Sequence, residues 1–175
     1  MRRRFALVSA FVVAFGVFVS GAGATAPNNE AGSYEIHLEA PNVAMAPNGD
    51  TFAVTGMGTF GVHPKSASGG GGWKHTFAGG GSASGTWTAN GLVAFQPYGC
   101  GVVFGTPLPP DLCGGRVVLD VTLTSPLGYV PAQLTIYCLI GAVPASAAEG
   151  IRLVIPGVSN FNKVVEGENV YIRTG

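Results

Sequence analysis

Two histidines in a glycine-dense stretch are the best candidates in this sequence for a reactive site. His63 and His75 lie on either side of the run Ser68-Gly69-Gly70. If that run is the loop of a hairpin spanning residues 60–77, the two imidazoles oppose each other across the strands, with β-carbons about 5 Å apart. Imidazole is a common zinc ligand, so this spacing predicts a divalent metal site.

A catalytic zinc site needs three protein ligands and one open position. We expect the third ligand from the polar face of the segment 33–39, as Glu35, His37 or Glu39, or from Asp50. Two histidines without a fixed third partner are also what a solvated hairpin carries. That second interpretation needs no cofactor, and the sequence favours it over a bound metal such as zinc.

The three cysteines suit an oxidising compartment, although an odd number leaves one unpaired. Glycines flank Cys100 and Cys113, and we expect these two to form a disulfide, which would contribute about 3 kcal/mol in the chain-entropy model. Cys138 is in register with Leu134 and Ile136, which favours a small buried apolar residue. A Cys113–Cys138 disulfide and a catalytic thiol at Cys138, assisted by a histidine, are the alternatives.

One further motif match is excluded by its context. Residues 56–61 fit the dinucleotide fingerprint G-x-G-x-x-G, but Pro64 and the run Gly69–Gly72 prevent the helix whose terminus would bind phosphate. The chain contains no G-x-S-x-G elbow, P-loop, C-x-x-C pair or calcium loop.

Aromatic residues offer a different kind of site. Trp73, Trp87, Phe77 and Tyr98 would suffice for a platform on which a saccharide stacks. Core packing explains the same residues, and we favour it because large aromatic side chains are mostly buried.

The hydrophobic pattern predicts that these candidate residues lie on strands and on the turns between them. Alternation over Ser33–Glu39 places Tyr34, Ile36 and Leu38 on one face, which predicts a half-buried strand. The same pattern over 116–124 and 132–140, around Pro126-Leu127-Gly128, predicts a hairpin. The other predicted strands are listed here: 51–62 with a bulge at Gly56-Met57-Gly58, 73–77, 84–95, 150–155, and 161–173 folded near Gly167.

About 8–10 short strands with glycine and proline between them predict an all-β domain. We expect an antiparallel β-sandwich, because the connections Thr106–Asp111 and Gly141–Glu149 are longer than tight meander turns. A closed up-and-down β-barrel is the alternative. One helical turn near Ser146–Glu149 is the only helix expected.

The N-terminus reads as a secretory signal peptide over residues 1–24. Three arginines precede an apolar run, and small residues end at Ala24, so we expect cleavage before Thr25. A short flexible segment, 25–32, and a single domain, 33–175, follow. The protein is therefore expected outside the cell, with no membrane span after cleavage; a twin-arginine signal is the alternative export route.

The net charge of the chain limits the kinds of partner that the protein is expected to bind. After residue 24 the chain has six basic and nine acidic residues, a net charge of −3, and the basic residues are not clustered. This charge distribution makes nucleic acid an unlikely partner. It favours a small neutral ligand, a saccharide or a partner protein, bound through glycine-rich loops. We therefore expect a secreted, non-enzymatic binding domain, with an enzyme built around His63 and His75 as the alternative.

Overall fold

The computed structural model describes residues 32–175, which form twelve strands and the turns between them. The expected signal peptide, its cleavage site at Ala24 and Thr25, and nearly all of the segment 25–32 lie outside the described residues. Within residues 32–175 no helix is long and apolar enough to cross a membrane. The strands are β1 (Ser33–Met45), β2 (Thr51–Gly61), β3 (Ser66–Thr76), β4 (Ser82–Cys100), β5 (Val102–Val103), β6 (Thr106–Pro107), β7 (Leu112–Ser125), β8 (Gly128–Cys138), β9 (Gly150–Ile155), β10 (Ser159–Phe161), β11 (Lys163–Glu166) and β12 (Asn169–Arg173).

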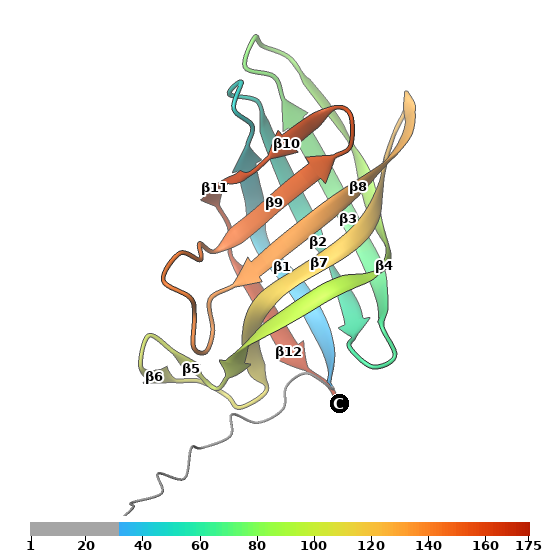
Figure 1. Cartoon of the computed structure of the whole chain (residues 1–175). Coiled ribbons are helices and arrows are strands. Elements are labelled where there is room, and N and C mark those ends of the chain that lie inside the picture. The colour runs from blue at the N-terminus through green and yellow to red at the C-terminus, as the bar shows by residue number, and fades with distance from the viewer. Residues whose placement is uncertain (1–31) are drawn as a thin grey trace, which may run out of the picture.

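The strands form two facing layers, and every pairing between them is antiparallel (Figure 1). One layer contains β1, β2, β3 and the first half of β4; the other contains β7, β8, β9 and β10. The layers are also joined by hydrogen bonds, since β4 pairs with β7 and β12 pairs with both β1 and β7. The all-β antiparallel fold predicted from the sequence is confirmed, and the facing layers agree with a sandwich.

Strand β4 passes from one layer to the other. Its residues 82–88 pair with β3 and its residues 86–100 pair with β7, so a short overlap belongs to both ladders. Three extra residues in β4 bend it on the way, because each β-bulge kinks the bulged strand and increases its twist. The register against β7 shifts at Ala89/Gly91, Leu92/Ala94 and Pro97/Gly99.

Alternation along the strands fills the space between the layers. In β1, Tyr34, Ile36 and Leu38 are buried while the residues between them face outward, as predicted. The β7–β8 hairpin contributes its predicted apolar stripes to the same core. Those stripes are Val117, Leu119, Val121 and Leu123 from β7, and Leu134, Ile136 and Cys138 from β8.

The glycine run Gly69–Gly72 lies in strand β3 and pairs with residues 55–58 of β2. The chain turns instead at residues 62–65, so the prediction of a loop at Ser68-Gly69-Gly70 is wrong. A β-carbon on Gly56 or Gly71 would overlap the backbone of the opposite strand. Glycine is required here because the two backbones approach too closely for side chains.

The bulge predicted at Gly56-Met57-Gly58 lies on the neighbouring strand. Strand β2 pairs with β3 from Thr51 to Gly61 without a register shift. Between Leu38 and Asn42, however, β1 advances four residues while β2 advances two. The extra residues therefore belong to β1, where Pro41 cannot donate a hydrogen bond to a ladder.

The predicted disulfide is confirmed. Cys100 and Cys113 are opposite each other in the β4–β7 ladder, with Cα atoms 3.9 Å apart, and they are bonded. Cys138 is free and buried, so the alternative Cys113–Cys138 disulfide is wrong. Burial raises the pKa of the Cys138 thiol to about 12, which keeps it protonated and unreactive at neutral pH.

The long connection between β8 and β9, residues 139–149, contains a turn rather than the expected helical turn at Ser146–Glu149. The N–H of Ala147 donates to the carbonyl of Pro144. The carboxylate of Glu149 anchors the connection, because it accepts the N–H of Leu139 at 2.6 Å and of Asn169 at 2.9 Å. We call residues 139–149 the strap.

Stability is expected to fall as pH rises from about 4.5 to about 7, because burial raises the pKa of Glu149 to about 7 from its ordinary value of 4.5. In that window the folded state holds a proton that the unfolded chain releases, so the slope is negative and at most about 1.4 kcal/mol per pH unit. Urea unfolding of Glu149→Gln should show this slope flattened. The exposed Glu166→Gln serves as the control, and an unchanged slope in Glu149→Gln contradicts the assignment.

Candidate functional site

An open cleft of about 390 Å³ lies between the two layers at one end of the molecule, and we call it the end cleft. Strands β4 and β7 pair only as far as Thr86 and Thr124. Beyond that point β4 continues with β3 alone and β7 continues with β8 alone, so the layers part. One layer contributes Phe52, Trp73, His75 and Ala83; the other contributes Leu123, Ser125, Leu127, Gly128, Tyr129, Val130, Ile155 and Val158.

The end cleft is surrounded by turns. Those that join β1 to β2, β3 to β4, β7 to β8 and β9 to β10 all lie at the end of the molecule away from the C-terminus (Figure 1). Three apolar side chains at its rim are strongly exposed: Leu127 by 96%, Tyr129 by 78% and Val158 by 71%. Among the described residues, the lining contains no lysine, arginine or acidic residue, so this surface is neutral and apolar apart from His75, Ser125 and the tyrosine hydroxyl.

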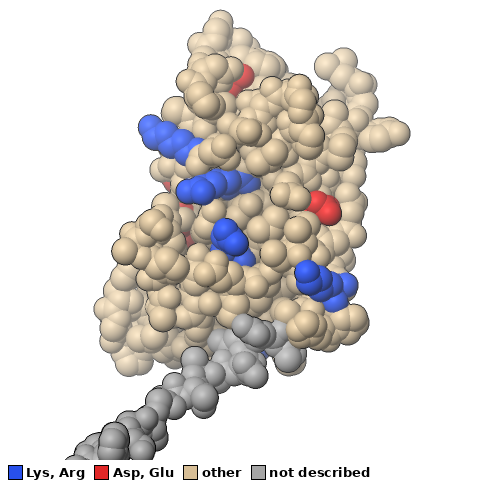
Figure 2. Space-filling view, viewed as in Figure 1, with Lys and Arg blue, Asp and Glu red and all other residues tan. Residues whose placement is uncertain are grey.

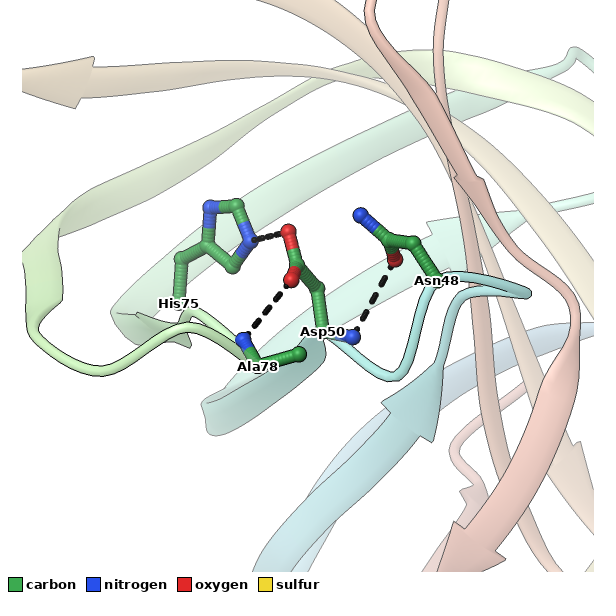
Figure 3. A network of polar contacts seen from close by, with 4 residues as sticks. All are labelled: Asn48, Asp50, His75 and Ala78. Atoms are coloured by element: carbon green, nitrogen blue, oxygen red, sulfur yellow. Dashed lines mark hydrogen bonds and ion pairs between the residues drawn. The ribbon is translucent and has the colours of Figure 1, made fainter.

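His75 is held by a carboxylate from the neighbouring turn. Its Nε2 lies 3.0 Å from Oδ2 of Asp50, while Oδ1 of Asp50 accepts the N–H of Ala78 at 2.9 Å (Figure 3). The N–H of Asp50 in turn donates to the side-chain oxygen of Asn48 at 3.1 Å. The β2–β3 register brings these groups together, since Thr51 and Thr76 are opposite each other and Asp50 and Phe77 come next.

The same contacts favour the ionised form of Asp50. The N–H of Ala78, and then the hydrogen bond from His75, hold the pKa of Asp50 below its ordinary value. An ionised carboxylate can only accept, so Nε2 of His75 carries a proton. In the neutral ring Nδ1 is then a hydrogen-bond acceptor, on the side of the imidazole away from Asp50 (Figure 3).

Aromatic rings surround the imidazole of His75. Its centroid lies 4.3 Å from that of Phe77 and 5.3 Å from that of Phe161, which it meets edge to face. Phe52 stacks on Trp73 at 5.3 Å. The indole N–H of Trp73 donates to the carbonyl of Thr86, so the polar group of this tryptophan is satisfied within the protein. This wall of the end cleft therefore offers flat apolar faces together with the polar ring of His75.

The structure separates the two histidines that the sequence predicted to oppose each other. His75 pairs with Phe52, whereas His63 lies in the β2–β3 turn. The pairs Phe52–His75 and Gly61–Ser66 are nine residue steps apart along the hairpin, about 30 Å at the usual strand rise. The predicted His63–His75 pair is therefore wrong, because the glycines between them extend β3 instead of forming the loop.

The residues predicted to supply the third ligand of a metal site also lie in different parts of the structure. His37 contacts Glu35 at 3.4 Å and Glu39 at 3.9 Å on the outer face of β1. Asp50 alone joins His75. Within the part of the chain that the structure describes, no group of three or more histidine, cysteine, aspartate or glutamate side chains is placed to hold a metal ion.

The four aromatics considered as a saccharide platform do not share one surface. Trp87 is buried in the core and its indole N–H donates to the carbonyl of Thr55. Tyr98 lines a different pocket, formed with residues of the strap. Trp73 lines the end cleft, and the ring of Phe77 contacts His75 beside it.

Sequence reasoning missed the rim of the end cleft. The signal that would have found it is an apolar residue at each hairpin tip: Leu127 within the turn Pro126-Leu127-Gly128, Tyr129 directly after it, and Val158 between β9 and β10. Turn residues are usually polar, so exposed apolar side chains at turns indicate a binding surface.

Comparison with known proteins adds no relative: no family model, no curated protein and no solved structure matches the chain.

Asp50→Asn is expected to lower the midpoint of urea unfolding, because the amide replaces the anion that accepts hydrogen bonds from both His75 and Ala78. Glu35→Gln is the matched control, since it alters the longer, exposed contact with His37. The shift for Asp50→Asn should be several times that for Glu35→Gln. Equal shifts would contradict a structural role for the Asp50–His75 pair.

Proposed function

We propose that this protein is an exported binding domain that holds a small, uncharged, mostly apolar molecule in the end cleft. The observation that carries the proposal is the combination of an apolar lining free of charged side chains with a single oriented histidine. Small-molecule sites are typically concave and apolar, with a few fixed polar groups that set the orientation of the ligand.

The size of the end cleft supports this ligand class. Its volume of about 390 Å³ is at the lower end of the 300–1,000 Å³ that is usual for ligand pockets. The exposed rim residues Leu127, Tyr129 and Val158 would lose contact with water when a ligand fills the mouth. Burial of apolar surface is the main favourable term in such binding, at roughly 25 cal/mol per Å².

The histidine narrows the ligand class further. Asp50 occupies Nε2 of His75, so the neutral ring presents only an acceptor, Nδ1. A hydroxyl or N–H group on an otherwise apolar ligand would satisfy it, whereas a carbonyl or ether oxygen would not. A ligand with one such donor is therefore preferred over a pure hydrocarbon.

The end cleft is not the surface of glycine-rich loops through which the sequence predicted binding. The glycine run Gly69–Gly72 is part of β3, and of the glycine-rich segments only the β3–β4 turn, Gly79–Gly81, lies at the end of the molecule that holds the cleft. The ligand surface is formed mainly by side chains of paired strands and by the apolar β7–β8 and β9–β10 turns.

An enzyme is the second candidate, because an Asp–His pair is also the base of many nucleophilic sites. The serine hydroxyl that lines the same cleft is that of Ser125. Its Oγ donates to the carbonyl of Gly128 and accepts the N–H of Leu127, so it closes the β7–β8 turn. No hydrogen bond joins it to His75 among the described residues, and the binding role is favoured for this reason.

The test uses N-phenyl-1-naphthylamine, a neutral apolar probe with one N–H donor. Its fluorescence should rise on binding to the mature protein, with a dissociation constant in the micromolar range. Val130→Asp should weaken binding at least tenfold, about 1.4 kcal/mol, because it places a charge in the apolar lining.

Val165→Asp is the matched control. Val165 is 46% exposed and Val130 is 41% exposed, both lie in strands, and only Val130 lines the end cleft. The control should bind the probe as the parent does. Failure of the parent to bind, or equal loss in both variants, would refute the proposed site.

A further inference from the structure

A second pocket, of about 260 Å³, differs from the end cleft in its chemistry. It lies on the outer face of the layer that contains β7, β8 and β9, beneath the strap. Its lining is mostly polar and includes two arginines, two tyrosines, a glutamine and a serine. We call it the arginine pocket, and it is lined by Gln96, Tyr98, Arg116, Tyr137, Pro144, Ser146, Ala147 and Arg152.

Strand register places the polar residues of the arginine pocket in one row. Gln96 of β4 is opposite Arg116 of β7, which is opposite Tyr137 of β8. The neighbours of Arg116 and Tyr137 in sequence, Val117 and Ile136, are fully buried, so the row itself faces outward. Side chains from three adjacent strands therefore converge on one spot of the outer face.

Arg152 completes the row from β9. It pairs with Thr135, two residues from Tyr137, and its guanidinium lies 5.3 Å from the centre of the Tyr137 ring. Although it faces outward, Tyr137 is only 8% exposed, because the strap covers it. The arginines thus meet in a place that is partly shielded from water, where charge interacts more strongly.

Among the described residues, neither Arg116 nor Arg152 has an acidic partner. None of the ion pairs found within residues 32–175 includes either arginine. The carboxylate of Asp120 accepts from Gln133, and that of Glu149 is turned toward backbone N–H groups. Strap residues 141–148 contain no acid. Two guanidinium groups therefore share one pocket without a counter-charge from the described chain.

At least one hydrogen-bond donor of the arginine pocket also lacks an acceptor among the described residues. Nε of Arg116 is buried and has no hydrogen-bond partner among the described residues. Burial raises the pKa of Tyr98, the neighbouring Tyr137 raises it further, and Arg116 lowers it, so the net shift is upward. Tyr98 therefore stays protonated and able to donate at neutral pH.

The charged side chains on the outer face around the arginine pocket are also mostly basic (Figure 2). Figure 2, drawn from the same side as Figure 1, shows more basic than acidic side chains over β7, β8 and β9. This local excess contrasts with the net charge of −3 after residue 24. An anion would be attracted to this face of the molecule.

We infer that the arginine pocket binds a small oxyanion, a carboxylate or a phosphate or sulfate group, between Arg116 and Arg152. Guanidinium groups match the oxygens of such anions with paired hydrogen bonds. The hydroxyl of Tyr98 and the amide of Gln96 add neutral donors. This site is independent of the end cleft, which takes an uncharged ligand.

Binding is tested by titrating phosphate, sulfate and benzoate at constant ionic strength, with chloride as the reference, and following heat or melting temperature. Arg152→Gln should weaken binding of the preferred anion at least fivefold. Arg152 is exposed, so this variant leaves the core intact. Lys163→Gln removes one charge from an exposed residue outside the pocket and should bind as the parent does.

A second variant, Arg116→Lys, keeps the positive charge but removes the planar fork, and it should also weaken binding. A response to phosphate and sulfate alone identifies a tetrahedral anion as the ligand group, and a response to benzoate alone identifies a carboxylate. No response to any of the three anions in the parent, or equal affinity in the parent and Arg152→Gln, overturns the inference.

Discussion

The ladder between β4 and β7 determines how the two layers are held together and where they separate. It joins the two layers, it contains the Cys100–Cys113 disulfide at one end, and it stops at Thr86 and Thr124 at the other. Where it stops the layers part, and the end cleft opens between them. Its three extra residues in β4 bend that strand from one layer into the other, so a single long strand determines both the closed and the open end.

The two sites follow from the two faces of the same strands. Inward residues of β7 and β8 form the core and, past the end of the ladder, the apolar lining of the end cleft. Outward residues of the same strands, Arg116 and Tyr137, form the arginine pocket under the strap. Because successive side chains of a strand alternate between faces, a neutral and a cationic site are carried by one hairpin without interfering.

The period-two pattern made much of this fold predictable. Strand β1, the β7–β8 hairpin with its turn at Pro126-Leu127-Gly128, and β9 carry alternating or continuous apolar side chains, and the structure confirms each. The disulfide was predictable because both cysteines lie at glycine-flanked positions beyond the regular pattern.

The sequence failed where side chains carry no pattern. Gly69–Gly72 have no side chains to alternate, so a strand and a loop look alike there, and the hairpin turn was misplaced by several residues. Because the turn was misplaced, the sequence wrongly predicted that His63 and His75 oppose each other across the hairpin. The contact of His75 with Asp50 depends on the true register, and the end cleft depends on where a ladder stops, so neither follows from local sequence.

Entry of an uncharged, mostly apolar ligand into the end cleft can be followed with the two tryptophans of the chain. Trp73 lines the cleft and Trp87 is buried in the core, so their indole N–H signals in a ¹H–¹⁵N NMR spectrum report on the two regions separately. Titration with N-phenyl-1-naphthylamine should shift the Trp73 signal progressively and leave that of Trp87 nearly unchanged. A Trp73 signal that does not move at saturating probe would contradict binding of the probe in the end cleft.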